Sequence, residues 1–285
     1  MARIKVLWLS FLALLLSNCE NPVITDEERT EPQGNLKVSI YQIEQTPFSA
    51  LTRAESGIAC SRLNFIVYDE SGSRLNQVSQ KVEEPGFGTT AFQLEEGIYQ
   101  LVVVGHSASG NPTTTNLSKI QFTNGTGYSD TFLYYGEVTV GTEQTDWEVS
   151  LHRIVSLCRF VITDDIPAEV KKLRFYYTGG SGAFDAATGL GSVASKQSVT
   201  FDVQEGQKQF DLYTFLHNPS DNIALKVTAL DASDNILRER DFDVPMKQNE
   251  VTWLTGSYFS GSSSGSTSIS ITINTDWAGE THQNF

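Results

Sequence analysis

The segment Leu36-Lys37-Val38-Ser39-Ile40 alternates apolar and polar residues without interruption. Successive side chains of a β-strand point to opposite faces of the sheet, so the three apolar residues would share one face and the two polar residues the other. Such a strand has one face on a core and the other in solvent. The pattern therefore predicts a half-buried strand over residues 36–43.

Similar short runs rich in Val, Ile, Tyr, Phe and Thr recur along the chain, separated by clusters of Gly, Asn, Asp and Ser. No segment keeps a helical period over three turns, and regularly spaced strands with turn signals are typical of β-sandwiches. The fold class that we predict is therefore all-β. The further strands are expected at 63–68, 98–104, 146–151, 155–162, 172–177, 199–203, 224–230, 239–244 and 267–274.

Two stretches, 67–75 and 229–237, share a strand end followed by Asp, Ser and Leu at matching positions. Asp bonds to its own backbone in turns, and Gly72 or Asn235 tolerates a positive φ, so both stretches are predicted to be tight hairpins. The match indicates two similar halves, although a chance likeness between two hairpins is the alternative. We place the boundary where one predicted strand leads directly into the next, giving domains at 36–150 and 151–285.

The first twenty residues have the layout of a signal peptide: Arg3 and Lys5, then the apolar run 6–16, then Leu16-Ser17-Asn18-Cys19. The apolar run is shorter than the ~20 residues that span a bilayer. The ending resembles the lipobox of bacterial lipoproteins, which implies a signal peptide at 1–18 and lipidation of Cys19. Several acyl chains would hold such a protein permanently at a membrane. A plain secretory signal with an incidental cysteine is the alternative.

The residues behind Cys19 are acidic and poor in apolar side chains, so 19–35 is predicted to be a flexible tether. This acidity resembles the signal that directs some lipoproteins to the outer membrane. Removing Arg3 and Lys5 with the signal peptide lowers the 20 basic residues to 18 against 34 acidic ones, a formal charge of −16. No basic stripe exists, so binding to nucleic acid is excluded.

The patterns that suggest chemistry have simpler explanations. Ser263 lies in a Gly-x-Ser-x-Gly match, but within Gly/Ser-rich sequence and without the helix that a nucleophilic serine needs. The histidines at 106, 152, 217 and 282 show no metal-ligand spacing. Asp164-Asp165 would suit calcium, but a turn before Pro167 also needs Asp. We therefore expect no catalytic residues, no metal and no cofactor.

Cys60 and Cys158 are the only cysteines beyond Cys19. A disulfide between them would suit an oxidising compartment, but the bridge requires Cα atoms within ~7 Å, which the sequence does not establish. Two separate buried thiols are the alternative.

Several blocks together resemble the fimbrillin superfamily of type V pili, and within it the fimbrillin-A-associated anchor branch. These blocks are 151–155 (LHRIV), 175–189 (FYYTGGSGAFDAATG), 210–216 (FDLYTFL), 225–231 (LKVTALD) and Asp276-Trp277. The resemblance implies two tandem transthyretin-like β-sandwiches, a lipid-anchored precursor in the outer membrane, and assembly with other fimbrial subunits by β-strand exchange. It implies no small-molecule substrate.

The same resemblance suggests two sites of assembly. Polymerising members of the family are cut after an arginine behind the first strand, and Arg53 has that position here, although an arginine in a loop is common. At the other end, Ile269, Ile271 and Ile273 alternate with polar residues behind a Gly/Ser-rich linker, so the segment is a candidate donor strand. It would equally serve as the last strand of its own domain.

The resulting hypothesis is a structural, non-enzymatic fimbrial subunit or pilus anchor that acts in cell adhesion. The alternative is a surface lipoprotein that binds glycan or host protein through exposed tryptophans, for which Trp147, Trp253 and Trp277 are candidates.

Overall fold

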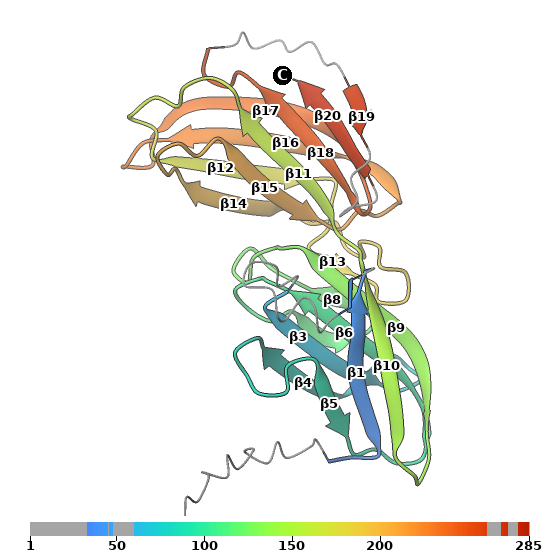
Figure 1. Ribbon diagram of the computed structural model, residues 1–285. Coiled ribbons are helices and arrows are strands. Elements are labelled where there is room, and N and C mark those ends of the chain that lie inside the picture. Colours follow the sequence, from blue (N-terminus) through green and yellow to red (C-terminus); the bar gives the residue numbers. More distant parts are fainter. Residues whose placement is uncertain (1–32, 45, 48–59, 261–268, 273–278, 285) are drawn as a thin grey trace, which may run out of the picture. The chain divides into compact units, whose positions relative to one another are not determined.

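The computed structural model describes residues 33–44, 46, 47, 60–260, 269–272 and 279–284 (Figure 1). Every regular element of this part is a β-strand, which confirms the predicted all-β class. None of the described residues forms a helix that is long and apolar enough to cross a bilayer.

The first sandwich is one sheet that folds over on itself around a core. Its strands are β1 (Leu36–Ile43), β2 (Thr46–Pro47), β3 (Arg62–Tyr68), β4 (Arg74–Lys81), β5 (Thr89–Phe92), β6 (Gly97–His106), β9 (Thr131–Val140) and β10 (Thr145–Arg153). The hydrogen-bonded order is β2-β1-β10-β9-β6-β3-β4, and β5 also pairs with β1. The strands β5, β1 and β10 thus face the layer β4-β3-β6-β9.

The second sandwich has two separate sheets (Figure 1). One sheet has the order β15-β11-β18-β20-β19 and the other β14-β12-β16-β17. Their strands are β11 (Ser156–Ile162), β12 (Lys172–Thr178), β14 (Gln197–Asp202), β15 (Gln209–Thr214), β16 (Ser220–Leu230), β17 (Ile236–Lys247), β18 (Glu250–Gly256), β19 (Ile269–Thr272) and β20 (Gly279–Asn284).

Seven strands follow the same plan in both sandwiches. In chain order, β1, β3, β4, β5, β6, β9 and β10 correspond to β11, β12, β14, β15, β16, β17 and β18, because the layers β5-β1-β10 and β4-β3-β6-β9 match β15-β11-β18 and β14-β12-β16-β17. The first strand is parallel to the last in each case, β1 to β10 and β11 to β18. The two halves are therefore similar in topology.

The sequence match between 67–75 and 229–237 joins hairpins that are not equivalent in this plan, since one is β3–β4 and the other β16–β17. Their turns are nevertheless alike. Asp69 Oδ1 accepts hydrogen bonds from N–H groups two and four residues later, and Asp231 Oδ1 does the same. Both pairs of strands shift register just before the turn. The positive φ falls at Gly72 (79°) and Asp234 (63°), which corrects the expectation for Asn235.

A third, small sheet joins the two halves. It has the order β13-β8-β7, in which β7 (Thr113–Asn116) and β8 (Lys119–Gln121) precede β9, and β13 (Ala183–Phe184) follows β12. A hydrophobic cluster beneath it draws on the outer side of β3 and β6 and on residues of the second half, including Phe184 and Phe215. Residues 32–285 accordingly form one compact unit.

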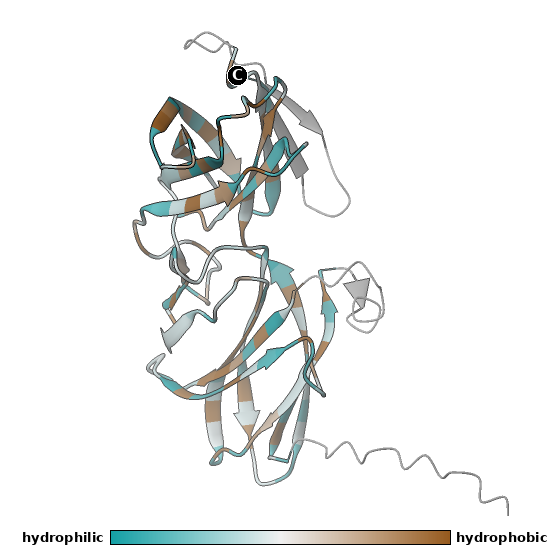
Figure 2. Cartoon of the chain, turned by 90° about the vertical axis from the view of Figure 1, so that its left-hand side faces the viewer, coloured by the Kyte–Doolittle hydropathy of each residue, from teal (hydrophilic) through white to brown (hydrophobic). Residues whose placement is uncertain are grey.

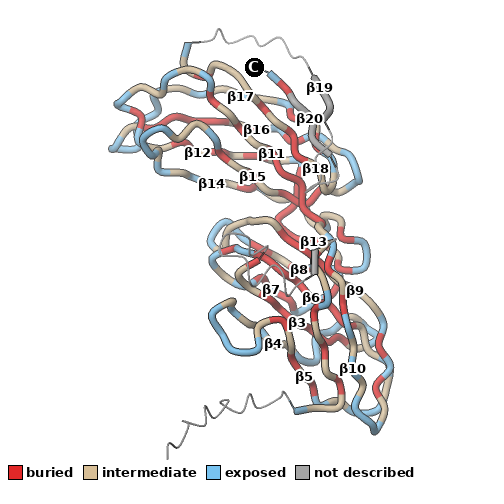
Figure 3. Tube along the Cα trace, viewed as in Figure 1, coloured by how far each residue is buried: buried red, intermediate tan, exposed pale blue. Residues whose placement is uncertain are grey.

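Each sandwich also has its own core, visible as alternating hydrophobic bands along the strands and as buried strand centres (Figures 2 and 3). The predicted strand 36–43 coincides with β1, and its residues Leu36 and Val38 are fully buried. The sequence did not predict the longer strands β4, β9, β15, β18 and β20 or the short strands β2, β5, β7, β8 and β13. In β4 and β20 the reason is chemical: β4 buries few side chains and β20 contains no aliphatic residue, so neither shows an apolar pattern.

Candidate assembly edges

Three residues that the sequence singled out, Cys19, Arg53 and Ile273, lie outside the described residues, as does Ser263. The lipidation and processing positions therefore remain predictions from the sequence. The described part does contain the strands on either side of them, and the edges of those strands are the candidate site.

The C-terminal strands pair within the second sandwich. β20 is parallel to β18, with Glu250 opposite Gly279 and Thr255 opposite Asn284. β19 is antiparallel to β20, with Ile269 opposite Gln283. The segment that contains Ile269 and Ile271 thus lies on its own domain in this structure, the second of the two arrangements considered for it, and β20 covers the outer edge of β18.

The chain just before this extension is held by a carboxylate. Asp164 accepts hydrogen bonds from the N–H groups of Tyr258 (2.9 Å), Phe259 (2.8 Å) and Ser260 (2.6 Å). Burial opposes the negative charge, but these bonds outweigh burial and hold the pKa of Asp164 below its usual value. Asp164 is thus a hydrogen-bond acceptor for the backbone, rather than the calcium ligand considered from the sequence.

Two arginines of β17 hold the same stretch from its carbonyl side. Arg240 donates to the carbonyl of Ser257 at 2.8 Å, and Arg238 to that of Phe259 at 2.7 Å. The fully buried Tyr258 donates its hydroxyl to the carbonyl of Val227 at 2.7 Å. We name residues 257–260 the clamp. The sequence assigns residues 256–268 to a Gly/Ser-rich linker, but Gly256 belongs to β18 and the clamp holds residues 257–260 on the second sandwich.

At the other end of the chain, the first strand, β1, is an inner part of the first sandwich. β1 is parallel to β10 on one side and antiparallel to β5 on the other. The residue after it, Glu44, accepts a hydrogen bond from the N–H of Arg153 and donates its own N–H to the carbonyl of Leu151 at 2.7 Å. The end of β1 is therefore tied to the end of β10.

Arg153 also connects the two halves. Its guanidinium donates to both carboxylate oxygens of Asp130, at 2.7 and 3.0 Å, and to Asn249 Oδ1 at 3.4 Å. The group lies 4.8 Å from the centre of the Phe132 ring. Burial raises the pKa of Asp130, and the adjacent guanidinium opposes that rise. The sequence placed Arg153 in the block 151–155 but gave it no role.

Cys60 and Cys158 are both free and buried, so the structure contains no bridge between them. Cys60 lies in the core of the first sandwich and Cys158 in the core of the second. Burial raises the pKa of each thiol to about 12. The structure thus has two separate buried thiols, which was the alternative to a disulfide, because the two cysteines lie in different cores.

The side chains of His106, His152 and His217 are described, and each has a separate environment; the side chain of His282 lies outside the described part. The buried ring of His106 lies 3.0 Å from the Asn64 side-chain amide, and burial lowers its pKa to about 4. His217 Nδ1 lies 2.9 Å from the carbonyl of Gly191, and His152 is exposed. Within the described ranges, no three His, Cys, Asp or Glu side chains are grouped in a way that would hold a metal ion.

Two of the candidate tryptophans are packed against other side chains. Trp147 is partly buried against the first core and donates its indole N–H to the Tyr134 hydroxyl at 2.9 Å. The Arg159 guanidinium stacks 4.8 Å from the Trp253 ring and pairs with both oxygens of Asp211. One face of the Trp253 ring is therefore occupied by a guanidinium, and Trp147 is oriented by its hydrogen bond to Tyr134. Trp277 lies outside the described residues.

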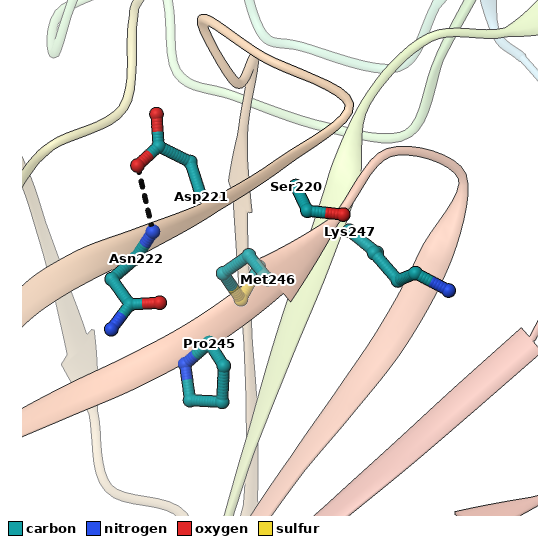
Figure 4. A pocket seen from close by; sticks show the side chains of 6 residues that line it. All are labelled: Ser220, Asp221, Asn222, Pro245, Met246 and Lys247. Atoms are coloured by element: carbon teal, nitrogen blue, oxygen red, sulfur yellow. Dashed lines mark hydrogen bonds between the residues drawn. The ribbon is translucent and has the colours of Figure 1, made fainter.

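A cavity of about 320 Å³ opens beside the start of β16 and the end of β17 (Figure 4). Asp221 accepts the backbone N–H of Asn222, and Asn222 donates its side-chain amide to Asp243, so these polar groups already have partners. The lining residues are Ser220, Asp221, Asn222, Pro245, Met246 and Lys247. The cavity holds no buried ionisable pair and gives no indication of chemistry.

The fold and these edges define a structural β-sandwich protein whose prominent features are strand edges and the segments that cover them. Residues 31–283 match the family model of the fimbrillin-A associated anchor proteins Mfa1 and Mfa2, so the chain belongs to this family. This membership confirms the resemblance seen in the sequence. A comparison with curated proteins finds no match.

Solved structures with similar chains include an adhesin candidate from Bacteroides ovatus, with 15% identity, a TM-score of 0.48, and coverage of 73% of this chain and 82% of that one. The fimbrial anchor protein Mfa2 from Porphyromonas gingivalis has 13% identity, a TM-score of 0.38, and coverage of 73% and 81%. A fimbrial assembly protein from Parabacteroides distasonis has 10% identity, a TM-score of 0.38, and coverage of 79% and 91%.

Proposed function

We propose that this protein is a lipid-anchored fimbrial subunit of the anchor type, located in the outer membrane, which joins other subunits of the fibre by β-strand addition. Membership of the anchor family supports the fimbrial role. The observation that carries the mode of assembly is the pairing of β20 with β18. β20 has the sequence Gly-Glu-Thr-His-Gln-Asn, so main-chain hydrogen bonds, rather than apolar anchors, are what it offers to an edge.

The N-terminal part of the proposal rests on the sequence. Residues 1–18 have the layout of a signal peptide, Cys19 is the lipidation site, and 19–35 is the tether. The sequence places the domain boundary between residues 150 and 151. The core clusters support a boundary slightly later in the chain, because Leu151 belongs to the first core, β10 runs to Arg153, and the second core begins at Cys158.

We also propose that the mature protein keeps its first strand. Leu36, Val38, Ile40 and Ile43 are all buried in β1, and burial of each such side chain is worth about 1.5–3 kcal/mol. Cleavage after Arg53 followed by loss of β1 would expose that core. An anchor that keeps its lipid and β1 does not need cleavage after Arg53.

Mass spectrometry of the N-terminal peptide, from protein isolated from intact cells, tests the proposal. Acylated Cys19 is the expected first residue, whereas a first residue at Ala54 would identify a processed stalk or tip subunit. Deletion of the gene provides the functional arm. We expect longer, loosely attached or shed fibres, and fibres unchanged in length and attachment would contradict an anchor role.

A further inference from the structure

The last strand of the shared plan differs between the two sandwiches in one respect. In the second sandwich β18 has β11 on one side and β20 on the other, both parallel to it. In the first sandwich the equivalent strand β10 has β1 on one side, and its pairing with β9 is confined to His152 and Arg153. Among the described residues, no strand pairs with the outer edge of β10 between Asp146 and Ser150.

Two backbone hydrogen bonds, one at each end of the pairing between β10 and β1, show which residues of β10 point their N–H and C=O groups toward β1. The N–H of Thr145 donates to the carbonyl of Asn35 at 2.8 Å, and the carbonyl of Leu151 accepts from Glu44. Because peptide groups alternate along a strand, the odd-numbered residues of β10 face β1. The N–H and C=O groups of residues 146, 148 and 150 therefore point to the outer edge.

We propose that this edge, residues 146–150 of β10, receives an extended segment of another fimbrial subunit, which runs parallel to β10 as β20 runs parallel to β18. The proposal rests on the proposed function and adds the place of contact. It leaves β1 in position, so an unprocessed anchor can accept a strand without first losing one.

The charges beside the edge indicate the chemistry of that segment. Asp146 and Glu148 are exposed and alternate along β10, and Glu143 is exposed in the preceding turn. Opposite charges in neighbouring strands stabilise pairing, and like charges directly beside each other destabilise it. The segment that fits has Lys or Arg at alternate positions.

A second copy of this chain fits less well. β20 contains Glu280 and no Lys or Arg, so a copy of β20 on this edge would add a like charge to the acidic residues of β10. The whole chain carries a formal charge of −14, which adds a general repulsion between copies. Acidic residues on an open edge also protect it from self-pairing.

The experiment uses the full-length protein in cells that assemble fibres and compares Glu148→Pro with Glu148→Ala. Proline removes the outward N–H of residue 148 without removing a bond to β1, and proline is accepted at such positions of edge strands. Alanine removes the carboxylate but keeps the N–H. We expect a loss of at least tenfold in anchored fibres for Glu148→Pro, a smaller loss for Glu148→Ala, and unchanged folding of both purified proteins by circular dichroism.

A photo-crosslinking residue at position 148 identifies what lies on the edge. Crosslinks to an extended segment of a different fimbrial subunit support the proposal; crosslinks only within this chain, or only to a second copy, overturn it. Charge reversal by Asp146→Lys, in the protein that carries the photo-crosslinking residue at position 148, should reduce the crosslinked product several-fold and serves as a second test if the proline variant fails to fold. Normal fibre anchoring by a folded Glu148→Pro variant would refute the edge while leaving the anchor role intact, since that role is tested separately by gene deletion.

Discussion

The N–H of Phe122 donates to the carbonyl oxygen of Gly182 at 2.8 Å, which joins the backbone after β8 to the loop before β13. Gly182 lies in the block 175–189, one of the blocks through which the sequence resembles its family. Phe215, in the block 210–216, exchanges two backbone hydrogen bonds with Ser181. The block 175–189 is thus bonded both to the first half, through Gly182, and to the block 210–216 of the second half, through Ser181, so these residues have a structural role.

Gly180 lies in the same block, 175–189, and the close packing there predicts the effect of adding a methyl group. A Cβ there would lie 2.0 Å from Thr214 Oγ1 and 3.0 Å from Thr214 Cβ, and Thr214 is buried with its hydroxyl bonded to Gln197. Overpacking of this kind costs about 1–3 kcal/mol. We expect a clear drop in the melting temperature of Gly180→Ala. Gly141→Ala, where a Cβ meets nothing within 4 Å, is the matched control and should melt like the parent protein.

The clamp predicts a pH-dependent contribution from Asp164. Asp164→Asn should destabilise the protein by about 1.5–3 kcal/mol near neutral pH, because it replaces charge-assisted hydrogen bonds by weaker ones. The folded-state pKa is lowered, so this stability is present above the unfolded value of ~3.9 and is lost as the pH falls through the folded pKa. Urea titrations at several pH values measure it.

Asp165→Asn is the control for the clamp, because Asp165 is fully exposed and its carboxylate lies 3.5 Å from the Lys208 ammonium. It should leave the unfolding free energy within about 0.5 kcal/mol of the parent. Equal losses for Asp164→Asn and Asp165→Asn, or a loss for Asp164→Asn that does not shrink in acid, would contradict the assignment.

The sequence predicted the class and the first strand, because alternating patterns such as that of β1 follow directly from one buried face. It also predicted two similar halves, but the match that suggested them, 67–75 and 229–237, joins hairpins that are not equivalent. It missed the clamp and the contacts of Arg153 with Asp130 and Asn249, because the partners lie far apart in the chain. Asp164 and Tyr258, for example, are 94 residues apart. It also missed β20, whose pairing uses backbone groups that every residue possesses. The order of apolar and polar residues in a sequence indicates which side chains are buried, but it does not indicate which strands pair through their backbone groups.

Arg153 and Asp130 form a pair that should be costly to break on one side only. The Arg153 side chain is 9% exposed and that of Asp130 24%. Removal of one member of a buried pair costs about 3–5 kcal/mol, so Arg153→Met should be strongly destabilising. The double variant Arg153→Met/Asp130→Asn should recover part of that loss. Denaturant melts of the four proteins give the coupling energy, and simple additivity would show that the pair is not coupled.

The deficit of Arg153→Met should shrink in acid, as that of Asp164→Asn does, but for a different reason: the pKa of Asp164 is lowered in the fold, whereas that of Asp130 is raised. Burial already raises the folded pKa of Asp130, and loss of the guanidinium raises it further. Such a group favours folding below its unfolded pKa of ~3.9, and that advantage is lost as the pH rises through the folded value. The deficit of Arg153→Met relative to the parent should therefore be larger at neutral pH than near pH 4.

Truncation after Ser260 tests whether the clamp makes the C-terminal strands separable from the second sandwich. The clamp groups, Asp164, Arg238 and Arg240, all lie before the cut and keep their bonds to residues 257–260. The truncated protein should unfold in one cooperative transition with only a modest loss of stability. The outer edge of β18 would then be open, and open edges promote association between chains. We expect concentration-dependent oligomers by sedimentation, and Thr255→Pro should suppress them. The carbonyl of Gly256 accepts from Thr163 on the β11 side, so the N–H of the preceding residue, Thr255, faces the outer edge. A truncated chain that is unfolded would show that β19 and β20 are part of the folding core, and a folded chain that stays monomeric at all concentrations would show that the β18 edge does not accept strands.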